Sequence, residues 1–277
     1  MIEYTTSLSR RRFLGVAVGG PAALMAAAAA AAGCAGCSKT SQAPFRPTEG
    51  DALLRSRPAA PTESVEAGLH ELALAPLRDG FLYVPPTYRA DQPAPLIVLL
   101  HGAGHDANEW ASAPLAQLFD DRGIVALIPS SRSSSWDIRF GAFGPDVRFI
   151  DSALAQTFRR CNIDPARLAL AGFSDGASYA LSLGASNGDF FGALMAFSPG
   201  FFAPAERKGT PKIYISHGTN DQVLPIDATS RRLVPQLRQL GYQVQYREFT
   251  GGHTVTMEVA QEAMAWWLPA PTMSSPR

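Results

Sequence analysis

The stretch LALAGFSDGASYAL, from Leu168 to Leu181, places a serine between two glycines where the residue pattern changes. An apolar run ends at Phe173, and small residues with helical spacing follow Ser174. The serine either caps a helix that follows a strand, or it is a nucleophile held on a strained turn. A serine hydroxyl is a poor nucleophile at neutral pH, so the second interpretation requires a base and a carboxylate that orients the base.

Strands alternate with helices along the rest of the chain. Runs with strand character are found at 68–75, 80–85, 96–100, 124–128, 168–173, 193–197, 212–216 and 243–249. Helices are expected at 108–121, 146–161, 175–183, 229–240 and 254–267, with Asp146 capping the second of them. The first two strands are expected to form an antiparallel pair, and the rest predict a mostly parallel sheet covered on both faces. In such sheets, ligands bind at the carboxyl ends of the strands.

The segment GFSDG, from Gly172 to Gly176, follows the fifth expected strand and matches the G-x-S-x-G nucleophile elbow of the α/β-hydrolases. The chain resembles this superfamily from about Gly68 to Leu268. The segments LLHGAGHDANEW, GFSDGASYALSLG, FSPG and HGTNDQVLPID are most similar to its carboxylesterase/phospholipase group, which is related to polyhydroxybutyrate depolymerases and feruloyl esterases. The resemblance implies the α/β-hydrolase fold. Only 14 residues separate the strands at 193–197 and 212–216, where a lid usually enters, so no large cap domain is expected.

The resemblance also implies the chain order Ser, then Asp or Glu, then His. Asp221 and His253 each follow an expected strand in that order, so Ser174, Asp221 and His253 are the expected catalytic triad. His217 also follows a strand but lies upstream of Asp221, and it is interpreted as a packed turn residue. His70 belongs to the antiparallel pair, outside the parallel core.

Two other carboxylates lie nearby. Asp227 fits a helix N-cap, and Asp175 follows the nucleophile, where its backbone is expected to matter more than its side chain. The resemblance implies an oxyanion hole made by the Asp175 amide and an amide from the HGAG turn that begins at His101. We expect that second amide to come from Ala103, with Gly102 as the alternative. His101 is expected to anchor the loop.

Aromatic residues in the long loop at 129–146 are candidates for a substrate pocket beside the serine. They are Trp136, Phe140 and Phe143, and Phe201 and Phe202 are similar candidates for a wall. The alternative is that these side chains only pack the loops onto the sheet.

Residues 1–37 read as an export signal, with a basic start, an apolar alanine-rich stretch and small residues before a cysteine. The segment SRRRFL resembles a twin-arginine signal. A basic flank of a transmembrane helix is the alternative, which glycine, proline and the alanine run disfavour. The triplet that ends at Cys34 resembles a lipoprotein signal, so Cys34 is a lipidation candidate; simple cleavage after a small residue is the alternative, and a second such triplet ends at Cys37.

Four segments are expected. Composition indicates the signal at 1–37 and a flexible tether rich in Pro, Ser, Thr and Ala at 38–65, and the resemblance implies an α/β-hydrolase domain at 66–270, followed by a tail at 271–277. Without residues 1–37 the chain has 21 basic and 23 acidic residues, which does not suggest a nucleic-acid partner. Three cysteines exclude a disulfide framework, although one bridge is conceivable outside the cytoplasm.

No H-E-x-x-H or G-x-G-x-x-G pattern is found, and the closely spaced Cys34 and Cys37 lie in the expected signal, so neither a metal nor a nucleotide cofactor is expected. The expected activity is that of an exported serine esterase, periplasmic or on the cell surface, acting on a small-molecule, lipid or polyester ester. The other expected contacts are the twin-arginine export machinery and a membrane tethered through Cys34. The alternatives are a serine peptidase or polyester depolymerase of the same fold, and a non-catalytic surface binding protein, which would carry a damaged triad.

Overall fold

Eight strands pair into one sheet in the computed structural model, which describes residues 52–268. They are β1 (Gly68–Glu71), β2 (Gly80–Val84), β3 (Ala94–Leu100), β4 (Val125–Pro129), β5 (Ile163–Phe173), β6 (Ala193–Phe197), β7 (Lys212–Gly218) and β8 (Val244–Phe249). Their order across the sheet is β1-β2-β4-β3-β5-β6-β7-β8. Strand β2 is antiparallel to β1 and β4, and all other pairs are parallel. The fold class predicted from the sequence is therefore confirmed, although the first strand ends at Glu71 and not at residue 75.

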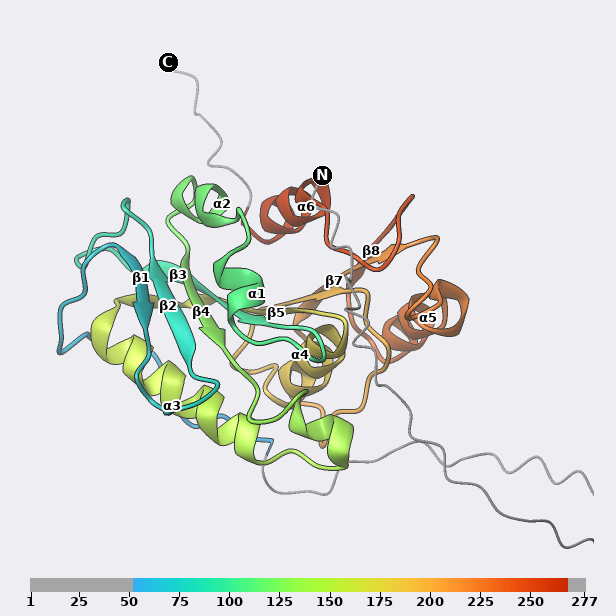
Figure 1. Ribbon diagram of the computed structural model, residues 1–277, viewed down its shortest axis with the longest axis horizontal. Helices are drawn as coiled ribbons and strands as arrows, with labels where there is room; N and C mark the ends of the chain where they lie inside the picture. Colours follow the sequence, from blue (N-terminus) through green and yellow to red (C-terminus); the bar gives the residue numbers. More distant parts are fainter. Residues whose placement is uncertain (1–51, 269–277) are drawn as a thin grey trace, which may run out of the picture. The chain divides into compact units, whose positions relative to one another are not determined.

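Helices cover both faces of this sheet (Figure 1). They are α1 (Asn108–Ala111), α2 (Ala116–Asp120), α3 (Pro145–Arg160), α4 (Asp175–Ser186), α5 (Ser230–Gln239) and α6 (Met257–Trp267), with the short 3₁₀ helices η1 (Asp137–Phe140) and η2 (Ile226–Ala228). Side chains of α3, α4 and α5 pack on one face, and those of α1, α2 and α6 pack on the other. The segment at 198–211 contains no helix or strand, as expected for a chain without a large cap between β6 and β7.

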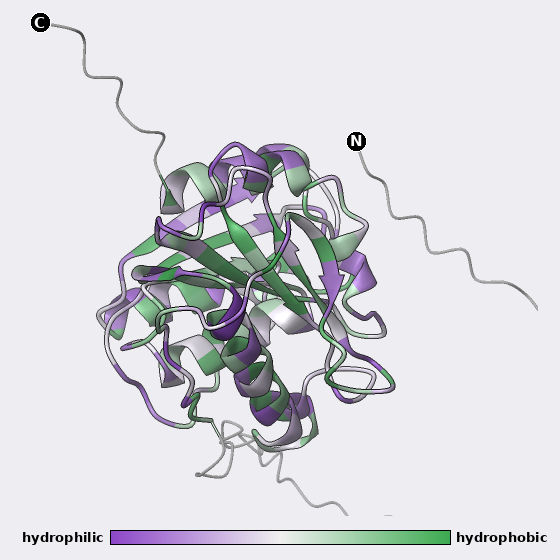
Figure 2. Ribbon diagram, turned by 90° about the vertical axis from the view of Figure 1, so that its left-hand side faces the viewer, coloured by the Kyte–Doolittle hydropathy of each residue, from purple (hydrophilic) through white to green (hydrophobic). Residues whose placement is uncertain are grey.

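The central strands are apolar along their length because both faces of the sheet are covered. In β3, Leu96, Val98 and Leu100 belong to the core on the α3 side, whereas Ile97 and Leu99 belong to the core on the α6 side. Figure 2 shows the hydrophobic colour concentrated on the strands between the helices. Polar side chains that could do chemistry are thereby left to the loops at the strand ends.

Three local expectations about helices are wrong. The helix expected at 108–121 is divided into α1 and α2, because Pro114 lies between them and the residue before a proline disfavours helical backbone. Asp146 does not cap α3: Gly144 precedes the helix, and the buried Asp146 side chain instead accepts the amides of Arg132 and Asp137. Asp227 lies in η2, so it does not cap α5.

The flexible tether expected at 38–65 does not extend that far, because residues 52–65 contact the folded domain. Ala52 and Leu54 are buried in the core. The side-chain amide of Asn187 accepts a hydrogen bond from Leu54 N (2.9 Å) and donates one to Ala52 O (2.7 Å). Further along, the Thr62 and Glu63 amides both donate to the Arg159 carbonyl. These bonds make residues 52–65 part of the packed domain.

The expected signal at 1–37 with Cys34, the first part of the tether and the tail at 271–277 lie outside the described residues. Within residues 52–268, no helix is long and apolar enough to cross a membrane. Cys161 is buried and free, and burial raises the pKa of its thiol to about 12.

Replacing Asn187 tests whether residues 52–54 stabilise the domain. We expect Asn187→Ala to lower the free energy of unfolding by about 1–3 kcal/mol, because it leaves buried backbone groups of Ala52 and Leu54 without partners. Urea unfolding of the full chain measures this. Gln117→Ala, which removes an exposed contact with Asp121, is the control and should stay within about 0.5 kcal/mol of wild type. Equal effects of the two substitutions would contradict the assignment.

Candidate active site

Ser174 lies on a sharp turn between β5 and α4. Its backbone has φ 56° and ψ −120°, which is left-handed on φ and uncommon for any residue with a side chain. The Ser174 amide donates to Phe197 O at 2.9 Å, which ties the turn to the end of β6. The side chain makes no capping hydrogen bond to α4, so the helix-cap interpretation does not apply. A backbone in this region holds the hydroxyl away from the helix it precedes.

The two glycines of the motif are required by close backbone contacts. A Cβ atom on Gly172 would lie 2.3 Å from Gly176 O, and one on Gly176 would lie 2.4 Å from the carbonyl oxygens of Leu100 and His101. Both contacts are with backbone, which cannot swing aside as a side chain could. The turn at Ser174 is therefore packed directly against the end of β3.

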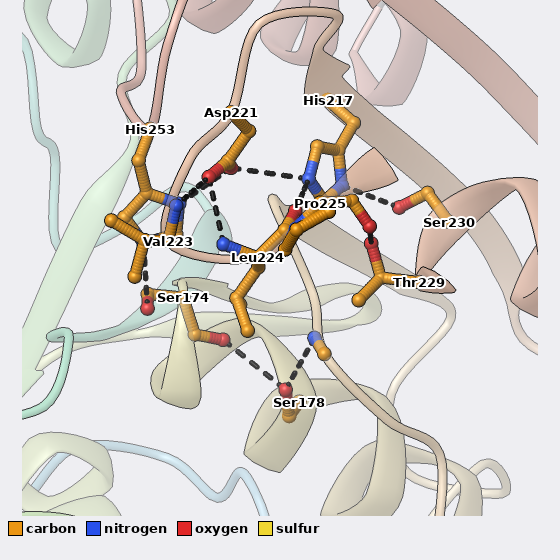
Figure 3. Close-up of polar contacts among 11 residues, drawn as sticks. Ser174, Ser178, His217, Asp221, Val223, Leu224, Pro225, Thr229, Ser230 and His253 are labelled. Carbon is orange, nitrogen blue, oxygen red and sulfur yellow. Dashed lines mark hydrogen bonds and ion pairs between the residues drawn. The ribbon is translucent and has the colours of Figure 1, made fainter. Parts of the chain in front are cut away.

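The structure brings Ser174, His253 and Asp221 together from three separate loops (Figure 3). His253 Nε2 lies 2.8 Å from Ser174 Oγ, and His253 Nδ1 lies 2.6 Å from Asp221 Oδ2. The loops that carry the two partners are joined by backbone hydrogen bonds from Thr219 N to Phe249 O and from Asn220 N to Gly251 O, both 2.9 Å. Strands β7 and β8 thus deliver the carboxylate and the imidazole to the same edge of the sheet.

The hydrogen-bond partners determine which nitrogen of His253 carries a proton. A carboxylate accepts hydrogen bonds and does not donate them, so Nδ1 donates to Asp221. In the neutral ring, Nε2 is then free to accept the hydroxyl proton of Ser174. The Phe173 ring, with its centroid 4.7 Å from that of His253, limits the movement of the imidazole. This arrangement can activate a serine for nucleophilic attack.

The loop after β3 lies beside the nucleophile and has almost all its polar groups engaged. His101 Nε2 accepts from Ser131 N at 2.9 Å, so its proton is on Nδ1, which donates to Gly102 O at 2.7 Å. Burial lowers the pKa of His101 to about 4, so the ring is neutral at pH 7. The Trp136 indole donates to His101 O at 2.9 Å, and Gly104 N donates to Ser134 O at 2.7 Å. His101 therefore anchors this loop.

These contacts distinguish between the two candidate amides for the oxyanion hole. Gly102 N donates to the Glu109 carboxylate at 2.7 Å, so its proton is already engaged. Ala103 N has no partner among the hydrogen bonds of the described residues. The Gly102–Ala103 peptide is planar and trans, so holding Gly102 O with His101 also fixes the direction of the Ala103 N–H. Ala103 N is thus the free donor of this loop.

Asp175 begins α4, so its amide has no acceptor within the helix and lies at the positive end of the helix dipole. Its side chain matters more than expected. Asp175 Oδ2 accepts a hydrogen bond from Ser135 Oγ at 2.9 Å and lies 3.5 Å from Arg139 Nε. The side chain thus fastens the loop at 130–140 to the start of α4.

The structure divides the four aromatic pocket candidates into three groups. Trp136 and Phe143 are 1% and 4% exposed, so they do not line an open pocket. Trp136 stacks on Tyr179 with ring centroids 5.0 Å apart, and Phe143 packs against the same ring. Phe140 is 65% exposed and lies one residue after Arg139, beside Asp175. Phe201 is half-buried, as is its neighbour Phe202.

Two features of the site were not foreseen in the sequence. Burial raises the pKa of Glu109, although the Gly102 amide opposes the shift, and this carboxylate helps to hold the loop after β3.

The second feature is on α4, where three buried serines each donate to the carbonyl four residues earlier and accept an amide from the segment after β6. The pairs are Ser178 with Gly200 (2.9 Å), Ser182 with Ala203 (3.0 Å) and Ser186 with Ala205 (3.2 Å). The signal was the spacing of four between serines on a helix buried on all sides.

Sequence and structure comparisons identify relatives of this chain. The profile of the Esterase family matches residues 77–205, which include the loop after β3 and Ser174. Feruloyl esterase B of Thermothelomyces thermophilus is 32% identical over 126 residues, 43% of each protein. The bifunctional acetylxylan esterase/xylanase XynS20E of Neocallimastix patriciarum is 28% identical over 151 residues, 53% of this chain and 22% of that protein. The chain spans 22% to 57% of the length of the curated relatives it matches.

A solved structure has the same fold. Esterase PE8 superimposes with a TM-score of 0.52 and 26% sequence identity, covering 63% of this chain and 94% of that one.

Beneath the site, the buried carboxylate of Asp146 and the half-buried carboxylate of Asp137 hold the loop that supports His101. Asp146 accepts the Asp137 amide at 2.6 Å, and Asp137 accepts the Asp146 amide at 2.9 Å and the Tyr179 hydroxyl at 2.9 Å. Burial and the neighbouring Asp137 charge raise the pKa of Asp146 to about 6, although the Arg132 and Asp137 amides oppose the shift. In the unfolded chain Asp146 titrates near pH 3.8.

The raised pKa of Asp146 predicts a pH-dependent stability. Between about pH 4 and 6 the folded state retains a proton that the unfolded chain loses, so this contribution to stability is lost as the pH rises through the folded pKa. Asp146→Asn stays neutral, so its stability relative to wild type should improve by on the order of 2 kcal/mol between pH 4.5 and 7.5. Urea unfolding at both pH values measures this. Asp164→Asn is the control: the Ala166 amide and Arg167 lower the pKa of Asp164 against its burial, so Asp164 is ionised in both states over this range and its substitution should leave the pH dependence of stability nearly unchanged.

Proposed function

We propose that this chain, which has the α/β-hydrolase fold, is a serine esterase that hydrolyses carboxylic esters through an acyl-enzyme. The observation that carries the proposal is the continuous set of hydrogen bonds from Ser174 through His253 to Asp221. The matches to the Esterase family and to fungal proteins named as feruloyl and acetylxylan esterases support an ester bond as the one cleaved.

In the proposed reaction, Ser174 Oγ attacks the ester carbonyl carbon while His253 Nε2 takes the hydroxyl proton. Asp221 holds the imidazole in the required tautomer and stabilises its charged form. The Ala103 and Asp175 amides donate to the oxygen that becomes negative in the tetrahedral intermediate. His253 then protonates the leaving alcohol. In the second half, His253 takes a proton from water, which attacks the acyl-serine and releases the acid.

The substrate is proposed to meet an open site. The segment after β6 is held along α4 by Ser178, Ser182 and Ser186 and contains no helix that could form a lid. Two exposed apolar side chains flank the catalytic residues: Phe140 follows Arg139, which contacts Asp175, and Val223, 64% exposed, donates its amide to Asp221. These two side chains, Phe140 and Val223, would form an apolar rim around the site. Such a rim suits an ester with a bulky or aromatic acyl group better than an acetate ester. Half-buried Phe201 is a further wall candidate.

We also propose that the chain is exported through a twin-arginine signal at 1–37 and tethered to a membrane through a lipidated Cys34. The support is the residue pattern SRRRFL and the triplet Ala32-Gly33-Cys34. The catalytic domain would include residue 52 onward, because Ala52 and Leu54 are buried in the core. Periplasmic or cell-surface residence would follow.

Ser174→Ala is the direct test of the proposed activity. We expect it to lower kcat/KM on p-nitrophenyl esters by at least about a thousandfold, because the covalent intermediate can no longer form. Labelling by a fluorophosphonate probe should be lost as well, with an unchanged circular dichroism spectrum. The series from acetate to palmitate would size the acyl site. Stoichiometric labelling of Ser174→Ala would sink the assignment, and a folded wild type inactive on every ester would favour a peptidase or a binding protein.

Phe140→Ala tests the proposed rim. Loss of the ring should raise KM for esters with aromatic acyl groups by about fivefold, which corresponds to about 1 kcal/mol of lost apolar contact, and leave KM for the acetate ester within twofold. Leu69→Ala is the matched control, because Leu69 is also exposed but lies on the edge strand β1. A uniform change across all esters would show that Phe140 does not select the acyl group.

A further inference from the structure

A second histidine lies on the opposite side of the Asp221 carboxylate from His253 (Figure 3). His217 is the penultimate residue of β7, and its side chain is fully buried. His217 Nε2 is 3.1 Å from Asp221 Oδ2, the same oxygen that lies 2.6 Å from His253 Nδ1. We infer that His217 is a positioning residue that donates a hydrogen bond to Asp221 and thereby limits the pull of this carboxylate on the protonated form of His253. The inference rests on the proposed function of the triad.

The contacts of His217 determine its tautomer. Its Nε2 lies 2.8 Å from the Leu224 carbonyl oxygen, which can only accept, so Nε2 carries a proton that it shares between Leu224 and Asp221. Its Nδ1 lies 2.7 Å from Ser230 Oγ, which can donate to it. Burial lowers the pKa of His217, so the ring is neutral near pH 7. His217 is therefore a fixed neutral donor and not a second positive charge.

With this donor, each oxygen of the Asp221 carboxylate has two nitrogen donors within 3.1 Å. Oδ1 accepts the Val223 and Leu224 amides at 2.9 and 2.8 Å, and Oδ2 accepts from His253 and His217. The Asp221 side chain has no exposed surface, so these donors replace the water that a carboxylate would otherwise bind. Loss of one donor would concentrate negative charge on the oxygen that faces His253.

Other charged groups around this pair are already balanced or more remote. Glu248 on β8 is the register partner of His217, but Arg231 on α5 holds its carboxylate with two hydrogen bonds of 3.0 and 2.7 Å. Glu109 on α1 also interacts electrostatically with His253, and its carboxylate accepts the Gly102 amide. Asp221 is thus the charge that His217 is placed to moderate.

This geometry predicts a specific effect on the pH profile. When the donor at Nε2 is removed, the unshielded Asp221 charge favours the protonated imidazole of His253, which cannot act as a base. The acid limb of the kcat/KM profile should then move to higher pH by about one unit. A shift of this size is comparable to the spread of histidine pKa values among folded proteins. Activity below the limb falls by up to about tenfold, whereas activity well above it recovers and KM stays unchanged.

Two substitutions of His217 separate this role from packing. In His217→Gln the side-chain amide nitrogen can occupy the place of Nε2 and still donate to Asp221. In His217→Asn the shorter side chain can reach Ser230 but not Asp221. We expect the acid limb to shift in His217→Asn and to stay at the wild-type pH in His217→Gln, with unfolding temperatures recorded for both. Ser230→Ala, which removes a contact on the far side of the ring and leaves the Nε2 donor, should not move the limb.

A shifted limb in His217→Gln or Ser230→Ala would overturn the inference, as would a loss of activity in His217→Asn that is uniform across pH. NMR titration of the His253 ring in the full chain gives a second readout, and its midpoint should rise by about one pH unit in His217→Asn. This readout does not depend on turnover. If wild type hydrolyses no ester but the His253 midpoint shifts as expected, the proposed function fails and the role of His217 stands. If esters are hydrolysed and the midpoint does not move, the role of His217 fails alone.

Discussion

The structure depends on one sharp turn, at Ser174, where the chain leaves β5 and enters α4. The turn exists because Gly172 and Gly176 let three stretches of backbone approach to distances that no Cβ atom would tolerate. This packing places the first amide of α4, the loop after β3 and the serine hydroxyl within one small volume. The strained φ of Ser174 persists because the surrounding sheet and helix are themselves well packed.

Polar groups around this turn are engaged in pairs that leave few donors free. His101 Nδ1 donates to the Gly102 carbonyl, and the Glu109 carboxylate accepts the Gly102 amide. These two bonds fix the Gly102 backbone and leave the Ala103 amide proton available. Asp221 is similarly surrounded by donors. Such saturation is expected at a buried polar site, because an unpaired group in a low-dielectric interior is costly. It leaves the Ala103 amide as a free donor in the loop after β3.

The loop at 129–146 has a supporting role in place of the pocket role expected for most of its aromatic residues. The Trp136 ring stacks on Tyr179 and also lies 4.8 Å from the His101 ring by centroid distance. Its indole N–H also holds the carbonyl at the end of β3. The loop thus supports the end of β3 with a buried aromatic stack, and among its three aromatic candidates only Phe140 is exposed.

The order of strands and helices and the sequence of Ser174, Asp221 and His253 were readable from the chain, because hydrophobic periodicity and glycine spacing are local properties. The tertiary structure alone decided which groups meet across long separations. Trp136 and His101 are 35 residues apart, and His253 and Ser174 are 79 apart. His217 has no local mark that distinguishes a packed histidine from one that touches a carboxylate. The contact of His217 with Asp221 forms because the chain after β7 turns back toward the end of that strand. The sequence pattern alone does not show this turn.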